Sequence, residues 1–240
     1  MDKQWNPSDL KGVKLVFHAS DGVSSTDDGS GNLLVDSWMD QAGTLSNGSR
    51  IYAMQVSTKR PIWNYSYITF DGANDRLDLH EEDGTDVEIT LDTSNGGWTL
   101  LAVYTSDDWS AGNEAILGDP DNSQNFFRHK PGSPNQFEIK INNTIKRFDL
   151  DTPTTLVNGN YYAILLSCLS DGTLRLSING NVQADSETIG NTNDYKIEQL
   201  ASKAGIDPLD GNIKHIIVVD RSLNGVEDLQ LKDWYQQYID

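Results

Sequence analysis

Residues 161–180 restrict how this chain can fold more than any other stretch. The first half, residues 161–169, is an almost unbroken apolar run, typical of a strand buried on both faces. An Asp-Gly turn signal at 171–172 leads into residues 173–178, which alternate apolar and polar side chains. A second turn signal, Asn-Gly at 179–180, precedes another strand. The stretch predicts a three-stranded meander whose buried middle needs a second layer to cover it.

Other segments have the composition of strands separated by turn residues. Two near-continuous apolar runs are expected as further core strands: residues 98–105, beside or across from the 161–169 strand, and residues 213–219. Residues 21–32 are polar and are expected to form a loop, and Trp38 is expected in the core. Shorter strands are expected at residues 13–17, 67–70, 76–79, 114–118, 136–141 and 144–150, with 67–70 and 76–79 paired as a hairpin.

One helix is expected, near the C-terminal end of the chain. Asn224 and Glu227 have the spacing of a capping box. A stripe of apolar side chains follows at helical spacing: Leu231, Trp234, Tyr235 and Tyr238. The sequence therefore predicts an all-β protein, a two-layer antiparallel β-sandwich of the jelly-roll type, with one C-terminal α-helix docked on it. We expect one domain over residues 1–240, because no repeat or linker interrupts the pattern.

Charge and cysteine content exclude several classes of function. The formal net charge is −18, which disfavours nucleic acid and anionic membranes, since both attract Lys and Arg. No apolar run reaches membrane-spanning length, and the N-terminal residues lack the apolar core of a signal peptide, so synthesis in a cytosol without membrane insertion is expected. Cys168 is the only cysteine, which leaves no disulfide framework and no cysteine zinc site.

The order of the segments resembles the LamG-like, concanavalin A-like jelly-roll family of lectin and glucanase folds. Four clusters carry this resemblance: Trp38 with Asp40 and Gly43; Arg60 and Pro61 followed by Phe70, Asp71, Gly72, Asp75 and Leu77; residues 161–180; and residues 211–223 with Glu227. The resemblance implies the fold and leaves the ligand open. Domains of this kind occur in secreted multidomain proteins and in virion proteins of tailed phages.

The main hypothesis is a non-enzymatic structural or adhesion protein of a phage virion, decorating the capsid or attached to the tail. Its partners would be other virion proteins, host-surface glycans and, as an alternative, further copies of itself, and it would be located in the virion. The first alternative is an extracellular carbohydrate-binding lectin module. The weaker alternative is a glycan hydrolase or lyase, which needs paired carboxylates about 5–5.5 Å apart on one strand. Asp86 and Glu88 offer one pair without a third acid, so no enzymatic activity is expected.

Aromatic side chains beside turn residues are the first candidate binding residues, because sugars stack on flat apolar faces. Trp63, Tyr65 and Trp109 lie in such places, and Asp107 and Asp108 next to Trp109 offer hydrogen-bond acceptors. These five residues are predicted to form a glycan platform or, equally, an interface with another subunit.

Residues 126–128 are a second candidate surface. Phe126, Phe127 and Arg128 combine the aromatic and arginine side chains that dominate protein interfaces. We expect the two phenylalanines, with Trp63 and Trp109, to anchor a partner.

A calcium ion is the only cofactor considered. Asp119 and Asp121 begin a segment with oxygen-bearing side chains at alternate positions, but the spacing is not that of an EF-hand. A calcium site on the rim of the sandwich and a solvated acidic turn are both left open.

Overall fold

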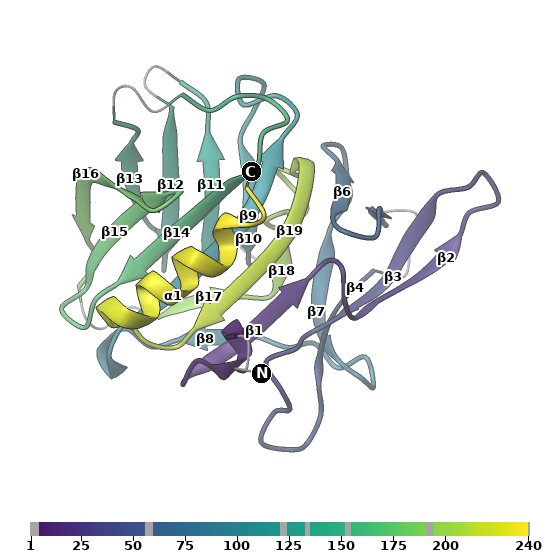
Figure 1. Cartoon of the computed structure of the whole chain (residues 1–240), viewed down its shortest axis with the longest axis horizontal. Coiled ribbons are helices and arrows are strands. Elements are labelled where there is room, and N and C mark those ends of the chain that lie inside the picture. The colour runs from purple at the N-terminus through teal and green to yellow at the C-terminus, as the bar shows by residue number, and fades with distance from the viewer. Residues whose placement is uncertain are drawn as a thin grey trace.

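The computed structural model describes residues 5–55, 60–120, 124–132, 135–151, 155–190 and 194–239. The chain is mostly antiparallel β structure with one C-terminal helix, and its strands form two layers, here called sheet one and sheet two (Figure 1). This arrangement confirms the predicted jelly-roll fold class. Two short 3-10 helices, η1 (Pro7–Asp9) and η2 (Thr93–Asn95), complete the elements outside the sheets.

Sheet one has the order β1-β19-β9-β14-β15-β16, and every neighbouring pair is antiparallel. Its strands are β1 (Val13–His18), β19 (Asp210–Val219), β9 (Trp98–Ser106), β14 (Tyr162–Cys168), β15 (Thr173–Ile178) and β16 (Asn181–Thr188). The three strands predicted for the core, β9, β14 and β19, are neighbours at its centre. The meander predicted from residues 161–180 is confirmed by β14, β15 and β16.

Sheet two has the order β2-β3-β4-β7-β18-β10-β11-β12-β13. Its strands are β2 (Val23–Asp27), β3 (Leu33–Met39), β4 (Ile51–Met54), β7 (Leu77–Glu81), β18 (Gln199–Leu200), β10 (Glu114–Gly118), β11 (Phe126–Lys130), β12 (Gln136–Ile141) and β13 (Thr144–Asp149). Two short strands, β5 (Ile62–Trp63) and β6 (Ile68–Asp71), connect the sheets, because β5 pairs with β3 and β6 pairs with β19. A separate pair joins β8 (Ile89–Leu91) to β17 (Tyr195–Ile197).

Two sequence predictions of local structure are wrong. β6 and β7 do not form a hairpin, because β6 pairs with β5 and β19 while β7 pairs with β4 and β18. The period of two identifies strands but not their partners, and here the chain crosses from one sheet to the other between the two strands. The polar segment 21–32 contains β2, which pairs with β3 in the ribbon that projects at the right of Figure 1. An exposed strand needs no apolar face, so its sequence looks like that of a loop.

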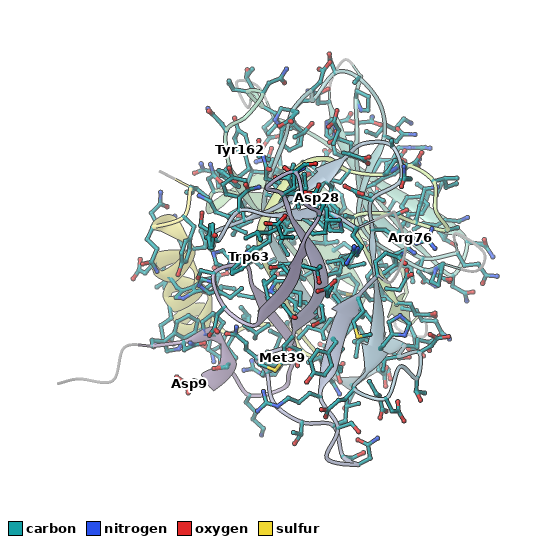
Figure 2. The ribbon with its side chains drawn as sticks, turned by 90° about the vertical axis from the view of Figure 1, so that its right-hand side faces the viewer. Asp9, Asp28, Met39, Trp63, Arg76 and Tyr162 are labelled. Atoms are coloured by element: carbon teal, nitrogen blue, oxygen red, sulfur yellow. The ribbon has the colours of Figure 1, made fainter. Side chains whose placement is uncertain are left out.

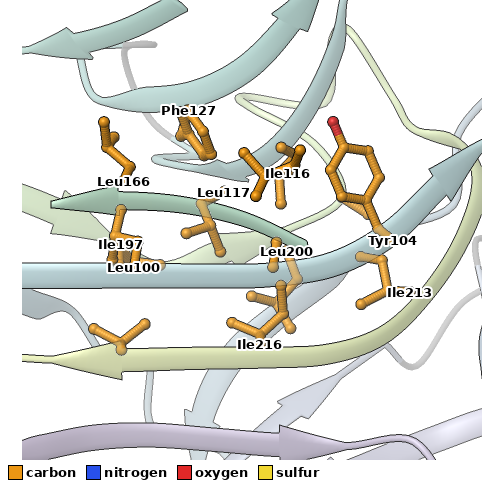
Figure 3. Close-up of a cluster of buried hydrophobic side chains, with 14 of the residues drawn as sticks. Leu100, Tyr104, Ile116, Leu117, Phe127, Leu166, Ile197, Leu200, Ile213 and Ile216 are labelled. Carbon is orange, nitrogen blue, oxygen red and sulfur yellow. The ribbon is translucent and has the colours of Figure 1, made fainter. Parts of the chain in front are cut away.

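The core lies between the two sheets. Its largest fully buried side chains include Trp38, Trp98 and Tyr104, and Cys168 is buried among them. Figure 3 shows side chains of β9, β14 and β19 meeting side chains of β10, β11 and β18.

The C-terminal helix α1 (Gly225–Gln236) begins with the predicted capping box. The Asn224 side chain accepts hydrogen bonds from the backbone N–H groups of Val226 and Glu227, both at 3.0 Å. Leu231, Trp234 and Tyr235 are buried against the outer face of sheet one, where the helix crosses β14 and β19 in Figure 1. No helix in the described ranges is long and apolar enough to cross a membrane.

Candidate functional site

The turn between β5 and β6 exposes one aromatic ring. Tyr65 is 67% exposed, and its φ of 63° lies in the left-handed region. The backbone N–H of Asn64 donates to the carbonyl of Tyr67 at 2.9 Å, and that of Ser66 donates to the carbonyl of Asn64 at 2.7 Å, which closes the turn around Tyr65. A bulky residue at positive φ is uncommon and costs about 1–2 kcal/mol. Such conformations concentrate at functional sites, so the turn is our first candidate.

Trp63 provides a fixed base for this exposed ring. The indole Nε1 donates to the carbonyl of Ala19 at 2.8 Å, and the side chain packs against the core. The ring centroids of Trp63 and Tyr65 are 4.8 Å apart at an interplanar angle of 48°. The structure therefore brings together two of the predicted site residues, on the side of the molecule that Figure 2 shows with Trp63 near its centre.

Polar side chains hold this turn to sheet one. The amide Nδ2 of Asn64 donates to Oγ1 of Thr69 at 2.9 Å, and the Thr69 hydroxyl donates to Oδ1 of Asn212 at 2.6 Å. Asn64 is thereby fixed beside Tyr65, where its amide group can contact a ligand lying on the ring.

Two further tyrosines, not foreseen from the sequence, form a second aromatic pair, in which Tyr161 packs against the outer face of sheet one. The ring centroids of Tyr67 and Tyr161 are 6.4 Å apart, and Nζ of Lys214 lies 3.7 Å from the Tyr161 ring centroid. Burial, then Tyr67 and the carboxylate of Asp107, raise the pKa of the Tyr161 hydroxyl. Asp107, a predicted site residue, is thus close to this tyrosine pair. Tyr67 could have been predicted as a site residue, because it lies two positions after Tyr65 in the sequence.

Trp109 lies in the turn after β9, but its side chain is buried, so its predicted role as a binding anchor is wrong. Its side chain is only 2% exposed, with its ring against those of Tyr104 and His129. The indole Nε1 donates to the carbonyl of Val157 at 3.1 Å, and the backbone N–H donates to Oδ1 of Asn158 at 3.1 Å. A segment distant in sequence satisfies the polar atoms of Trp109, which allows the ring to close one end of the core.

Asp108, next to Trp109, has a local structural role. Its Oδ1 accepts hydrogen bonds from the backbone N–H of Ser110 at 2.9 Å and from the Ser110 hydroxyl at 2.6 Å. These hydrogen bonds lower the pKa of Asp108. The carboxylate stabilises the turn after β9.

The prediction that Phe126 and Phe127 anchor a partner is also wrong, because both side chains are buried. They lie on β11, an interior strand of sheet two, so Phe127 faces the core and Phe126 faces outward. Phe126 is covered by cations: the guanidinium carbon of Arg128 lies 4.5 Å from its ring centroid, and Nζ of Lys203 lies 4.8 Å away. Arg128 does face outward, where it forms ion pairs with Glu138 and Asp207.

The structure places only part of the suggested calcium site. Asp119 is nearly buried, and Asp121 lies outside the described residues. Within the described ranges, no group of three or more His, Cys, Asp or Glu side chains is arranged to hold a metal ion.

The carboxylates weighed for a hydrolase are engaged in other contacts. Oδ1 of Asp86 lies 3.0 Å from Nδ1 of His80, and Oε2 of Glu88 lies 2.8 Å from Nζ of Lys196.

Comparison with known proteins establishes the fold. No protein-family model and no curated protein sequence matches this chain. A solved structure of Trypanosoma rangeli sialidase with 2,3-difluorosialic acid matches with a TM-score of 0.58 and 13% identity, over 96% of this chain and 34% of the sialidase chain. In its fold, the chain is similar to concanavalin A-like lectin domains.

Structures of a neurotoxin domain match in the same way. The binding domain of botulinum neurotoxin DC in complex with SialylT gives a TM-score of 0.53 at 12% identity, over 97% of this chain and 52% of that one. The same domain in complex with rat synaptotagmin II gives a TM-score of 0.56 at 12% identity, over 95% and 52%. The chain therefore spans about a third of the sialidase and about half of the neurotoxin domain, and at these identities the likeness concerns the fold alone.

Proposed function

We propose that this chain is a glycan-binding module of the lectin type, and that it binds sugar through the turn around Tyr65. The observation that carries this proposal is the exposed Tyr65 ring, held in a left-handed conformation on a fixed Trp63. The similarity in fold to lectin domains supports it, as do the ligands named for two of the similar structures, sialic acid and SialylT. This choice favours the first alternative from the sequence over the phage virion role.

The chemistry of the turn fits a sugar better than a protein partner. A pyranose ring has an apolar face, which packs on an aromatic ring, and an edge of hydroxyls, which need donors and acceptors. The turn offers Tyr65 for the face and the side chains of Asn64 and Ser66 for the edge. One rigid aromatic side chain in a shallow polar setting is a small contact, so we expect weak binding at a single site and stronger binding when sites are clustered.

We further propose that the module binds without catalysis, as the sequence predicts. The contact of Asp86 with His80 and the ion pair of Glu88 with Lys196 support this proposal, since both acids of the one alternate pair are already engaged. Glycan binding would place the module where glycans are displayed, in the extracellular space or at the surface of a particle. Mass spectrometry of purified phage particles from the source would test the virion role directly.

Glycan-array binding of the full chain, followed by titration with the best ligand, tests the proposed function. Tyr65→Ala should weaken binding by about tenfold or more, because an aromatic hot spot contributes about 2 kcal/mol. The matched control is Leu229→Ala, which removes another exposed apolar side chain from the outer surface of α1 and should leave binding unchanged. Failure of the wild-type chain to bind any glycan, or equal losses in both variants, would refute the proposal.

A further inference from the structure

The outer face of β11, β12 and β13 carries a regular grid of side chains. The strand register places three residues in each row across the three strands. The rows are Phe126, Lys140 and Ile145; Arg128, Glu138 and Arg147; and Lys130, Gln136 and Asp149. Neighbours in such a grid are separated by about 5 Å across strands and about 7 Å along them.

Glu138 holds the cations of the grid in place. Its carboxylate is fully buried and accepts hydrogen bonds from Nε of Arg128 at 2.9 Å, Nε of Arg147 at 2.7 Å and Nζ of Lys130 at 3.1 Å. Burial alone would raise the pKa of Glu138, but the hydrogen bonds from the three cations outweigh it and hold the pKa at about 2. The carboxylate therefore stays ionised at any physiological pH, and the cations stay oriented around it.

This sharing leaves the grid with an excess of positive charge. Lys14 pairs singly with Asp220, and Lys196 pairs singly with Glu88. In the grid, three cations share Glu138, and Lys140 forms no ion pair within the described part of the chain. With Lys203 and Asp207, which lie against Phe126 and Arg128, five cationic side chains thus stand against three anionic ones, on a protein whose formal net charge is −18.

The cationic groups of the grid are accessible to a ligand. The side chain of Arg147 is 52% exposed and that of Lys130 is 35% exposed, and Lys140 is half-buried. Ile145, beside Lys140, is an exposed apolar residue on the same face. The surface therefore combines preorganised cations with an apolar spot.

We propose that this grid, the outer face of β11–β13, binds a carboxylated polysaccharide. Its carboxylates would contact Arg147, Lys130 and Lys140, and the apolar face of one sugar would lie on Ile145. A spacing of about 5–7 Å between cations is comparable to the length of one sugar unit. A nucleic acid is disfavoured, because its denser phosphates would be repelled more strongly by the other acidic surfaces of this chain. The grid is separate from the turn around Tyr65 and does not depend on that site.

Binding of the full chain to polygalacturonate, with neutral dextran and poly(U) as comparison polymers, tests this inference. We expect wild-type protein to prefer polygalacturonate at 150 mM salt, with an affinity that falls as salt increases. The double variant Lys140→Gln/Arg147→Gln should lose at least about tenfold in affinity, since each charge-assisted contact contributes about 1.5 kcal/mol or more. The double variant Lys11→Gln/Lys14→Gln removes the same charge elsewhere and should change the affinity by less than about twofold.

Further variants keep the test decisive. Arg147→Lys retains the charge and should recover part of the affinity that Arg147→Gln loses. Should the grid double variant fail to fold, Lys140→Gln alone serves, because Lys140 has no ion pair to lose. Tyr65→Ala should leave polygalacturonate binding intact, which separates this inference from the proposed function. The inference is wrong if wild-type protein binds dextran or poly(U) as tightly as polygalacturonate, or if both double variants lose affinity equally.

Discussion

The ring of His215 lies 4.1 Å from the ring of Tyr238, centroid to centroid, beneath the C-terminal end of α1. His18 and Trp234 close the same cage at 4.1 Å and 4.8 Å from His215. Neither nitrogen of His215 has a hydrogen-bond partner within the described ranges, whereas Nε2 of His18 lies 3.1 Å from the Tyr238 hydroxyl. The helix therefore covers an uncharged histidine that has no anion to stabilise its protonated form.

This cage predicts that acid destabilises the protein through His215. Burial, then the positive charges of His18 and Lys214, lower the pKa of His215 well below its usual value. Protonation at low pH therefore favours the unfolded chain: the stability contributed by neutral His215 is complete above about pH 6.5 and is lost as the pH falls below it. The free energy of unfolding should lose about 2 kcal/mol through this residue between pH 7 and pH 5.

Urea unfolding at both pH values measures this loss, with His215→Leu as the comparison. The difference in stability between wild-type protein and the variant should shift by about 2 kcal/mol between the two pH values. Titrating groups that do not interact with His215 contribute equally to both proteins and cancel, whereas His18, in contact with His215, belongs to the measured shift. A constant difference would show that His215 does not carry the pH dependence.

We expect Glu114 to have the opposite effect, so that the free energy of unfolding falls at high pH. Its side chain is buried, and Oε2 has no hydrogen-bond partner in the described structure. Burial raises the pKa of Glu114 to about 8. The charges of Asp210 and Asp107 also raise it, whereas the hydrogen bond from Ser106 lowers it. A pKa raised on folding means that stability is complete below about pH 4.5 and is lost as the pH rises toward 8. Glu114→Gln should therefore gain about 2–4 kcal/mol over wild-type protein between pH 5 and pH 8.

Glu138→Gln is the matched control in this measurement. The pKa of Glu138 is about 2, so its carboxylate is ionised throughout this range, and the variant should be destabilised by an amount that does not change with pH. If Glu114→Gln gains nothing at pH 8, its carboxyl group is not held in the protonated form.

Alanine substitutions at two glycines would separate the effects of backbone conformation and of close packing on the free energy of unfolding. Both have a left-handed backbone, with φ values of 76° at Gly97 and 87° at Gly84. A Cβ added at Gly97 would lie 2.0 Å from the carbonyl oxygen of Cys168, whereas a Cβ added at Gly84 would meet nothing within 4 Å. Gly84→Ala should cost about 1–2 kcal/mol for the left-handed conformation. Gly97→Ala should cost at least about 3 kcal/mol, because the backbone of β14 must also move. Equal urea midpoints for the two variants would contradict this prediction.

The sequence alone predicts most of the regular structure, because those signals are local. The apolar run at residues 161–169 becomes β14 (Tyr162–Cys168), and both turns after it have positive φ at Gly172, Asn179 and Gly180 as the turn chemistry requires. The capping residue Asn224 and the apolar stripe of α1 also appear as predicted.

The candidate site could be predicted only in part. Trp63 and Tyr65 come from one short turn, so their proximity follows from the local sequence. Tyr161 lies far from Tyr67 in the chain. The two tyrosines come together only because β6 pairs with β19, β19 with β9, and β9 with β14.

The sequence by itself determined where most strands and turns and the helix form, since periodicity and turn chemistry act over a few residues. Tertiary structure alone decided that Trp109 and Phe126 are buried. Trp109 stands among polar residues, yet its indole is buried because the carbonyl of Val157, 48 residues away, accepts its hydrogen bond. Phe126 is covered because Lys203 and Arg128 converge on it from separate segments. Burial depends on contacts between distant parts of the chain, and no local pattern records them.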